Sequence, residues 1–362
     1  MHPALSTAFT ELVGVRYPIV QTGMGWVAGP RLVSATTNAG GLGILAGATM
    51  TYAELRDAII EVKARTIAPF GVNLRADAPD ASKRIDLLIE HGVRVGSFAL
   101  APRADLIARL KAAGVVVMPS IGRKRHAEKV VEMGADAILI QGGEGGGHTG
   151  DVPTSLLLPQ VVDAVGDQIP IVAAGGYFDG RGLVSALAYG AAGIAMGTRF
   201  LLTDDSTVPD TVKAFYLERS LAETVRTTKV DGVPHRVLRT ALVAELEAAG
   251  QLRAMIAALR NAARFRRISG TSWSAMAREG LAMKRSHELT WSQVLMAANT
   301  PMLLRAAMVQ GRPDLGVMSS GQVVGLIDDL PTVSELINRI MLQADDVLKR
   351  LSGASGAVSA VV

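Results

Sequence analysis

Short runs of apolar and β-branched residues recur along the first part of the chain, separated by segments with a different spacing of apolar side chains. Eight of these runs have the length of buried strands, at residues 18–21, 41–45, 70–74, 93–100, 115–121, 137–141, 169–174 and 193–200. The segments between them repeat apolar positions every three to four residues, as amphipathic helices do. The pattern therefore predicts a repeating βα architecture.

The ends of the helical segments support this interpretation. Thr51 and Glu54 have the spacing of a capping box before an apolar helical pattern. Three later segments end at Gly92, Gly114 and Gly134, and glycine favours the left-handed conformation that follows a helix. Eight βα units favour a closed (β/α)8 TIM barrel over an open doubly wound sheet, because the first strand lacks the glycine spacing of a dinucleotide-binding turn.

After about Asp205 the pattern changes to helical segments without intervening strands, at 212–220, 240–259, 274–283 and 291–308. We interpret these segments as a helical cap above the strand ends. A last helix is expected from near Thr332 to Leu351. The expected organisation is a cofactor-binding barrel over 1–205, a helical cap and substrate domain over 206–317, a return segment and closing helix over 318–351, and a loose tail over 352–362.

Composition narrows the class of protein. The 362 residues suffice for a barrel of about 250 residues and a cap. Apolar residues make up 49% but aromatic residues only 4%, and 38 glycines are present, which suits a core of Val, Ile, Leu and Ala. The absence of cysteine excludes disulfides and cysteine-ligated metals and makes the cytoplasm the default compartment.

Charge and hydropathy exclude two kinds of partner. A formal charge of +4 is mild, and aromatic residues are not interleaved with the basic ones, so nucleic-acid binding is not expected. The one long uncharged stretch, 182–198, is shorter than the roughly 20 residues of a membrane helix and contains glycines. The expected partner is therefore a small molecule, with a homo-oligomer left open.

A glycine-rich stretch holds the strongest chemical signal. Residues 141–150 read Gln-Gly-Gly-Glu-Gly-Gly-Gly-His-Thr-Gly directly after the sixth apolar run. Glycines allow a flat ligand to approach the backbone, and His148 provides an imidazole that would face such a ligand. Two further glycine turns, 175–176 and 197–198, follow the seventh and eighth runs, where many barrels bind a phosphate group. The arrangement is typical of a flavin site.

Amide side chains lie at the ends of other predicted strands. Asn73 and Gln141 each offer a donor and an acceptor, which matches the edge of an isoalloxazine ring, although either could merely cap a turn. His148 could move a proton on a carbon next to an electron-withdrawing group, or could simply bind loop backbone. Glu144 lies four residues before His148, but the glycines between them disfavour a helix, so no metal site is expected.

These residues carry a resemblance to a known family. Segments 40–43, 71–73, 141–148, 173–176 and 196–200 resemble the nitronate monooxygenases, formerly 2-nitropropane dioxygenases, a family that also includes flavin-dependent enoyl reductases. The resemblance implies an FMN-binding TIM barrel with His148 as the catalytic histidine and NAD(P)H or O2 as electron partner. The implied FMN contacts are Thr22, Gly23, Met24, Asn73, Gln141, Gly146, Gly147, Gly175, Gly176, Ala195, Met196, Gly197 and Thr198.

The chain departs from the family pattern at three positions. Gly23 stands where proline is common, Gly145 where alanine or serine is common, and Asp205 where glutamate is usual. These changes leave the expected FMN site intact but weaken the expectation of nitroalkane oxidation. Residues 291–293 and 321–322 resemble the IpdC-type flavoproteins of actinobacterial steroid degradation and cholesterol catabolism, which implies a CoA thioester of a bicyclic steroid fragment as substrate.

A basic segment gives a second indication of an anionic substrate. Eight basic residues and one acid lie between Arg253 and Arg285. Such a cluster suits the phosphates of coenzyme A, but a solvated helix face or a subunit interface would explain the same charges. The candidate substrate contacts are Arg264, Arg266, Arg267, Lys284 and Arg285.

Four functions remain in competition. The leading hypothesis is an FMN-dependent dehydrogenase or reductase that acts next to the carbonyl of an acyl-CoA, with His148 as acid and base and flavin N5 as hydride carrier. The alternatives are a nitronate monooxygenase that uses O2, an enoyl reductase that uses NAD(P)H, and a non-catalytic flavin or phosphate binder.

Overall fold

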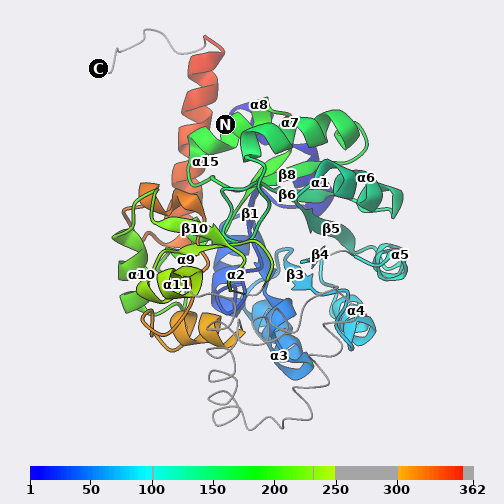
Figure 1. Ribbon diagram of the computed structural model, residues 1–362. Helices are drawn as coiled ribbons and strands as arrows, with labels where there is room; N and C mark the ends of the chain where they lie inside the picture. Colours follow the sequence, from blue (N-terminus) through cyan, green and yellow to red (C-terminus); the bar gives the residue numbers. More distant parts are fainter. Residues whose placement is uncertain (100–101, 231, 249–300, 354–362) are drawn as a thin grey trace. The chain divides into compact units, whose positions relative to one another are not determined.

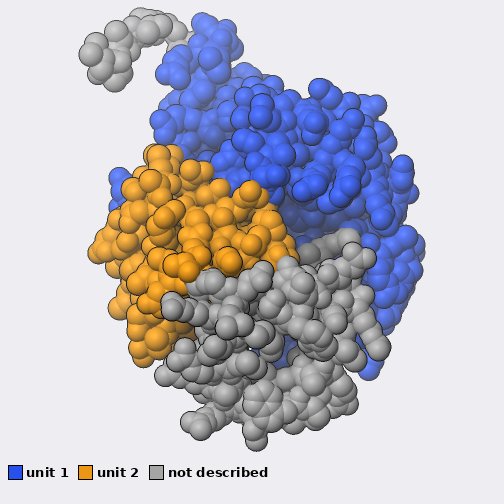
Figure 2. Space-filling model, viewed as in Figure 1, with its two compact units in different colours: residues 1–145, 150–207, 327–362 blue, residues 146–149, 208–326 orange. Residues whose placement is uncertain are grey.

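The computed structural model describes residues 1–99, 102–230, 232–248 and 301–353, and they form two compact units (Figure 2). The barrel unit comprises Met1–Gly145, Gly150–Thr207 and Ile327–Val362. The second unit comprises Gly146–Thr149 and Val208–Leu326. The chain therefore leaves the barrel unit for only four residues inside the glycine-rich stretch.

The barrel unit contains a closed barrel of eight parallel strands in the order β1-β2-β3-β4-β5-β6-β8-β9 (Figure 1). The strands are β1 (Ile19–Gln21), β2 (Leu42–Leu45), β3 (Gly71–Leu74), β4 (Val95–Phe98), β5 (Val116–Ile121), β6 (Ile138–Gln141), β8 (Ile171–Ala174) and β9 (Gly193–Met196). Each lies within one of the eight predicted runs. The predicted TIM barrel is confirmed, and the open sheet is excluded by the pairing of β1 with β9.

Helices alternate with these strands along the chain (Figure 1). They are η1 (Pro3–Leu5), α1 (Ala8–Val13), α2 (Pro30–Asn38), η2 (Gly47–Thr49), α3 (Tyr52–Arg65), α4 (Ala81–Glu90), α5 (Ala104–Ala112), α6 (Lys124–Glu132), α7 (Thr154–Val165), α8 (Gly180–Ala188), α9 (Thr198–Leu201) and α15 (Val333–Leu351). The capping box of Thr51 and Glu54 starts α3 as predicted. Gly92, Gly114 and Gly134 have φ of 64°, 74° and 90°, as expected after a helix.

The barrel has a filled interior. Alternate residues of the strands, such as Val20, Ile44 and Val172, pack there in one cluster. Phe9 and Val13 of α1 join the same cluster, and backbone carbonyls of α1 accept hydrogen bonds from the Arg94 guanidinium just before β4. Helix α1 therefore closes the end of the barrel at which the strands begin.

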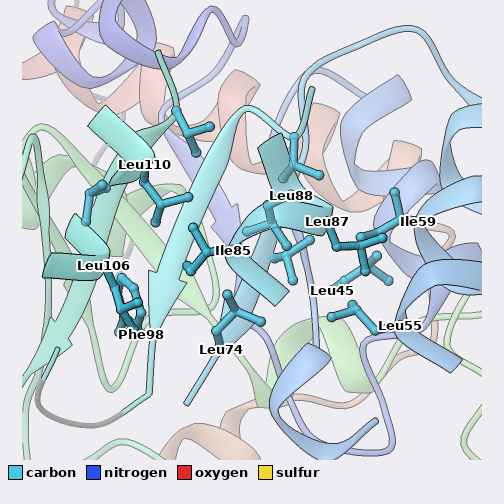
Figure 3. Close-up of a cluster of buried hydrophobic side chains, with 14 of the residues drawn as sticks. Leu45, Leu55, Ile59, Leu74, Ile85, Leu87, Leu88, Phe98, Leu106 and Leu110 are labelled. Atoms are coloured by element: carbon cyan, nitrogen blue, oxygen red, sulfur yellow. The ribbon is translucent and has the colours of Figure 1, made fainter. Parts of the chain in front are cut away.

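A second cluster lies outside the strands, under the helices. Leu45, Leu74 and Phe98 project from β2, β3 and β4 against Leu55 of α3 and Leu106 of α5 (Figure 3). These side chains are almost completely removed from solvent. Because neighbouring residues of a strand face opposite sides, this outer cluster identifies Asn73 as an inward-facing residue between Val72 and Leu74.

Ion pairs around the buried Arg199 link helix α15 to the segment that follows β9. The Arg199 guanidinium, 4% exposed, donates to Asp329 Oδ1 at 2.8 Å, and Arg339 of α15 donates to the other oxygen of the same carboxylate. Asp205 Oδ2 accepts from the backbone N–H of Val333 at 2.8 Å, the first residue of α15. Asp205, noted in the sequence as a departure from the glutamate usual in the family, therefore caps the last helix.

The second unit contains a three-stranded sheet in the order β10-β11-β7. Its strands are β7 (Gly147–His148), β10 (Thr224–Thr227) and β11 (His235–Leu238), and its described helices include α10 (Asp210–Leu217), α11 (Ala241–Ala248) and η3 (Gln322–Leu326). The prediction that no strand follows Asp205 was therefore wrong. Strands of four residues with mixed polarity give too weak a periodic signal against longer helical patterns.

None of the helices in the described ranges is long and apolar enough to cross a membrane.

The approach of α2 to β2 requires glycine at position 43. A Cβ on Gly43 would lie 2.4 Å from the carbonyl oxygen of Val33 and 2.9 Å from its Cα. These are backbone atoms, so we expect Gly43→Ala to lower the free energy of unfolding by about 2–3 kcal/mol. Thermal or chemical denaturation measures this loss. Gly122→Ala is the matched control, because its Cβ would make only an ordinary contact of 3.7 Å, and an equal loss there would contradict the explanation.

Candidate functional site

Closure of the barrel brings the first and last strand ends together. Thr22 follows β1, and its backbone N–H donates to the carbonyl of Met196 at 3.2 Å. A Cβ on Gly197 would lie 3.4 Å from both Met24 Sδ and Thr22 Oγ1. Residues predicted from two distant segments to bind one cofactor therefore lie beside each other.

The two residues at the end of β9 face opposite sides. Ala195 packs in the interior cluster, so Met196 points outward toward the helices. Only the backbone of Met196, and not its side chain, can therefore face the mouth of the barrel. The buried Thr198 begins α9 immediately afterwards.

Asn73 faces inward near the end of β3, and Gly23 leaves space for its side chain. A Cβ on Gly23 would be 2.5 Å from the Cβ of Asn73. Asn73 is paired in register with Ser97 of β4, whose side chain also points inward. The predicted cofactor residues Gly23 and Asn73 thus form one contact, in which the missing side chain at position 23 leaves space for the amide.

Gln141 is the corresponding amide at the end of β6. Ala137 and Leu139 of the same segment pack in the interior cluster, and alternation places Gln141 on the same inward face. Its side chain passes closely over Gly145: a Cβ there would lie 2.6 Å from Gln141 Nε2 and 2.7 Å from its Cγ.

Glu144 and Thr154 hold the first half of the glycine-rich loop. Glu144 Oε2 accepts from both the backbone N–H of Thr154, at 2.9 Å, and its hydroxyl, at 2.7 Å. Thr154 is the first residue of α7, where carboxylates are favoured by the exposed amide groups. Glu144, considered in the sequence only as a metal ligand, therefore braces the loop against a helix. No role for Thr154 was predicted from the sequence.

The turn after β8 packs on this brace. Gly175 and Gly176 have φ of 106° and 83°, which only glycine adopts without strain. A Cβ on Gly175 would lie 2.8 Å from Thr154 Oγ1 and 3.2 Å from the Gly145 nitrogen. Burial, together with the nearby Glu144 charge, raises the pKa of Tyr177, so its phenol stays protonated at physiological pH.

Residues 146–149 of the glycine-rich loop belong to the second unit. Gly146 lies against Ser320 and Gly321, whose backbone atoms would be 2.5 Å from a Cβ at that position. Gly147 has φ of 74° and open space where a side chain would be. Gly147 and His148 form β7, which pairs antiparallel with β11 so that His148 lies opposite His235. The imidazole of His148 is exposed.

His235 is a second imidazole at this position that sequence reasoning did not single out. Its ring centroid lies 4.6 Å from that of His148. The sequence signal would have been a histidine in a short alternating segment, but only strand pairing makes the two rings neighbours.

The predicted substrate contacts Arg264, Arg266, Arg267, Lys284 and Arg285 lie outside the described residues. Within the described ranges, no three His, Asp or Glu side chains converge as a metal site would require.

The profile of the nitronate monooxygenase family matches residues 6–343 of the chain. This chain belongs to that family. It is accordingly a flavin-dependent oxidoreductase, as the resemblance of its motifs predicted.

Two curated relatives are similar over nearly their whole length. A Rhodococcus jostii protein is 63% identical over 356 residues, 98% of this chain and 99% of the relative. A Mycobacterium tuberculosis protein is 64% identical over 355 residues, with the same coverage. Both are named "(3aS,4S,5R,7aS)-5-hydroxy-7a-methyl-1-oxo-octahydro-1H-indene-4-carboxyl-CoA dehydrogenase".

A solved structure of FabK from Thermotoga maritima superposes with a TM-score of 0.78 at 32% identity, covering 96% of this chain and 99% of that one. This nitronate monooxygenase-family chain thus shares its fold with FabK along almost all of its length.

A substitution at Gly145, which lies against Gln141, should weaken flavin binding without lowering the stability of the fold. We expect Gly145→Ala to displace the Gln141 side chain from its Cγ to its amide, which a change of rotamer accommodates, so the melting temperature changes little. The predicted hydrogen bond from the Gln141 amide to the flavin would be worth about 1–2 kcal/mol, so its loss should weaken flavin binding roughly 5- to 30-fold. Titration of the flavin-free protein with FMN measures this.

Two further variants decide the cause of that effect. Gln141→Ala should weaken FMN binding to a similar extent, and the double variant should add nothing, because both changes remove one contact. Gly150→Ala, whose Cβ would make an ordinary contact of 3.5 Å, is the control. Full FMN affinity in Gly145→Ala would show that Gln141 does not bind the cofactor.

Proposed function

We propose that this chain is an FMN-dependent dehydrogenase that acts beside the carbonyl of a CoA thioester with a bicyclic, steroid-derived ring system. The observation that carries the proposal is the identity of 63% and 64% with two proteins named as dehydrogenases of such a thioester, spread over 98% of this chain. Family members that act on different substrates usually differ in their loops. Here the alignment covers nearly all of the loops.

The residues at the strand ends of the barrel unit fit FMN. Asn73 and Gln141 supply inward amides for the edge of the ring. The turn at Gly175 and Gly176 adopts a backbone conformation that favours glycine, and Gly197 and Thr198 follow the neighbouring strand. Such paired turns at β8 and β9 suit a phosphate. Bound FMN would supply the acceptor for a hydride.

His148 is the group that moves the proton. The thioester carbonyl acidifies the hydrogen on its α carbon, and the His148 imidazole is the base that accepts that proton. The hydride leaves the adjacent β carbon at the same time, so the substrate loses two hydrogens and gains one carbon–carbon double bond. In the reverse direction the same imidazole returns the proton to the α carbon.

Anaerobic mixing of the FMN-loaded protein with the bicyclic CoA thioester tests this proposal. We expect the thioester to bleach the flavin absorbance, and we expect His148→Asn to slow bleaching by about 10²- to 10⁴-fold while the thioester still binds. His91→Asn is the control, because His91 ends α4 on the outside of the barrel unit.

The same experiment separates the alternatives. Bleaching by a nitronate and not by the thioester, followed by oxygen uptake, would identify a nitronate monooxygenase instead. Bleaching by NAD(P)H, with reoxidation by an unsaturated thioester, would identify an enoyl reductase. A flavin that none of these compounds bleaches would leave only the binding role.

We also propose that the basic segment that includes Arg266 and Arg267 binds the phosphates of coenzyme A. Guanidinium groups bind phosphate oxygens through two parallel hydrogen bonds. Replacing both with glutamate should raise the KM for the CoA thioester at least tenfold and leave kcat within about threefold, since phosphate contacts are made equally before and during the reaction. An unchanged KM would assign these charges to a solvated face or a subunit interface.

A further inference from the structure

Two histidines of the second unit form a pair with unequal exposure. His148 of β7 and His235 of β11 are register partners, and their rings are 4.6 Å apart with an angle of 42° between the planes. His235 is 1% exposed, whereas His148 is exposed. The exposed imidazole of His148 can therefore contact a substrate, while the buried imidazole of His235 packs behind it.

The buried ring is fixed by its neighbours. His235 Nε2 and Ser319 Oγ share a hydrogen bond of 2.8 Å. The backbone carbonyl of Ser319 accepts a hydrogen bond of 2.7 Å from the hydroxyl of Tyr216, which is completely buried. An isolated bridge between Ser319 and Val237 ties the same residue to β11. Ser319, which bonds the His235 ring, is thus itself fixed by Tyr216 and by β11.

An exposed imidazole without a neighbour occupies several rotamers. Strand β7 has only two residues, and in the part of the chain that the structure describes the ring of His235 lies against His148 from the opposite position in the sheet. Contact with a fixed ring favours one orientation of His148 over the others.

We propose that His235, held by Ser319, is a positioning residue that orients the His148 imidazole for proton transfer. The proposal rests on the proposed function, in which His148 carries the proton. The ring of His235, and not its capacity to bind a proton, is what His148 requires.

Truncation of His235 tests the requirement for a fixed ring. We expect His235→Ala to lower kcat about 10- to 100-fold and to leave KM within about threefold, because orientation of a catalytic group affects the reaction more than binding. Val237→Ala is the matched control, because Val237 is a buried residue of the same strand that does not contact His148 through a ring. An equal fall of kcat in Val237→Ala would overturn the proposal.

A rescue variant distinguishes two roles of His235: an aromatic ring that supports His148, or a group that transfers protons. The double variant His235→Phe with Ser319→Ala keeps an aromatic ring and removes the hydroxyl that would otherwise lose its partner. We expect it to recover kcat to within about fivefold of the natural protein. Activity as low as that of His235→Ala would mean that protons pass through His235 and Ser319, and would overturn the positioning role.

A readout without substrate keeps this inference separate from the proposed function. The chain has six histidines, so the ring signals of isotope-labelled histidine can be resolved by NMR, and His148→Asn assigns one of them. We expect the His148 signal to shift and broaden in His235→Ala and to stay in place in Val237→Ala. An unchanged signal and unchanged kcat would refute the pair, whereas a shifted signal in a protein that no thioester reduces would refute only the proposed reaction.

Discussion

The pairing of β1 with β9 is the constraint on which the barrel unit depends. Ile19, Val20 and Gln21 pair with Ile194, Ala195 and Met196, far apart in the sequence. This pairing removes the last two free edges of the sheet and forces the inner faces of eight strands into one core. It also brings the ends of the first and last strands together, which creates the adjacency of Thr22 and Gly197.

The glycine-rich stretch is shaped largely by contacts within the protein. The sequence suggested that its glycines admit a flat ligand, yet at three positions the protein itself occupies the space of a side chain. Gly142 lies against Thr154, Gly145 against Gln141, and Gly146 against the backbone at Ser320 and Gly321. These contacts give the loop one conformation, and Glu144 fastens that conformation to the start of α7.

The same stretch joins the two units through the chain. Gly145 ends a segment of the barrel unit, the next four residues belong to the second unit, and Gly150 returns to the barrel unit. Within those four residues lies His148, whose backbone is set by pairing with β11. The proposed cofactor site therefore depends on barrel strands, while the orientation of the proposed catalytic imidazole depends on a separate small sheet and its buried neighbour His235.

The sequence alone determined the eight strands, the helix caps and the family, because apolar periodicity, capping boxes and glycine motifs are local signals. It also located the glycine turns and His148. Only the tertiary structure decided which residues meet: strand closure, the brace of Glu144 on Thr154, and the pairing of His148 with His235 join residues that no local spacing connects. Short strands such as β10 and β11 are stabilised by their partners and not by their own periodicity, which is why the sequence concealed them.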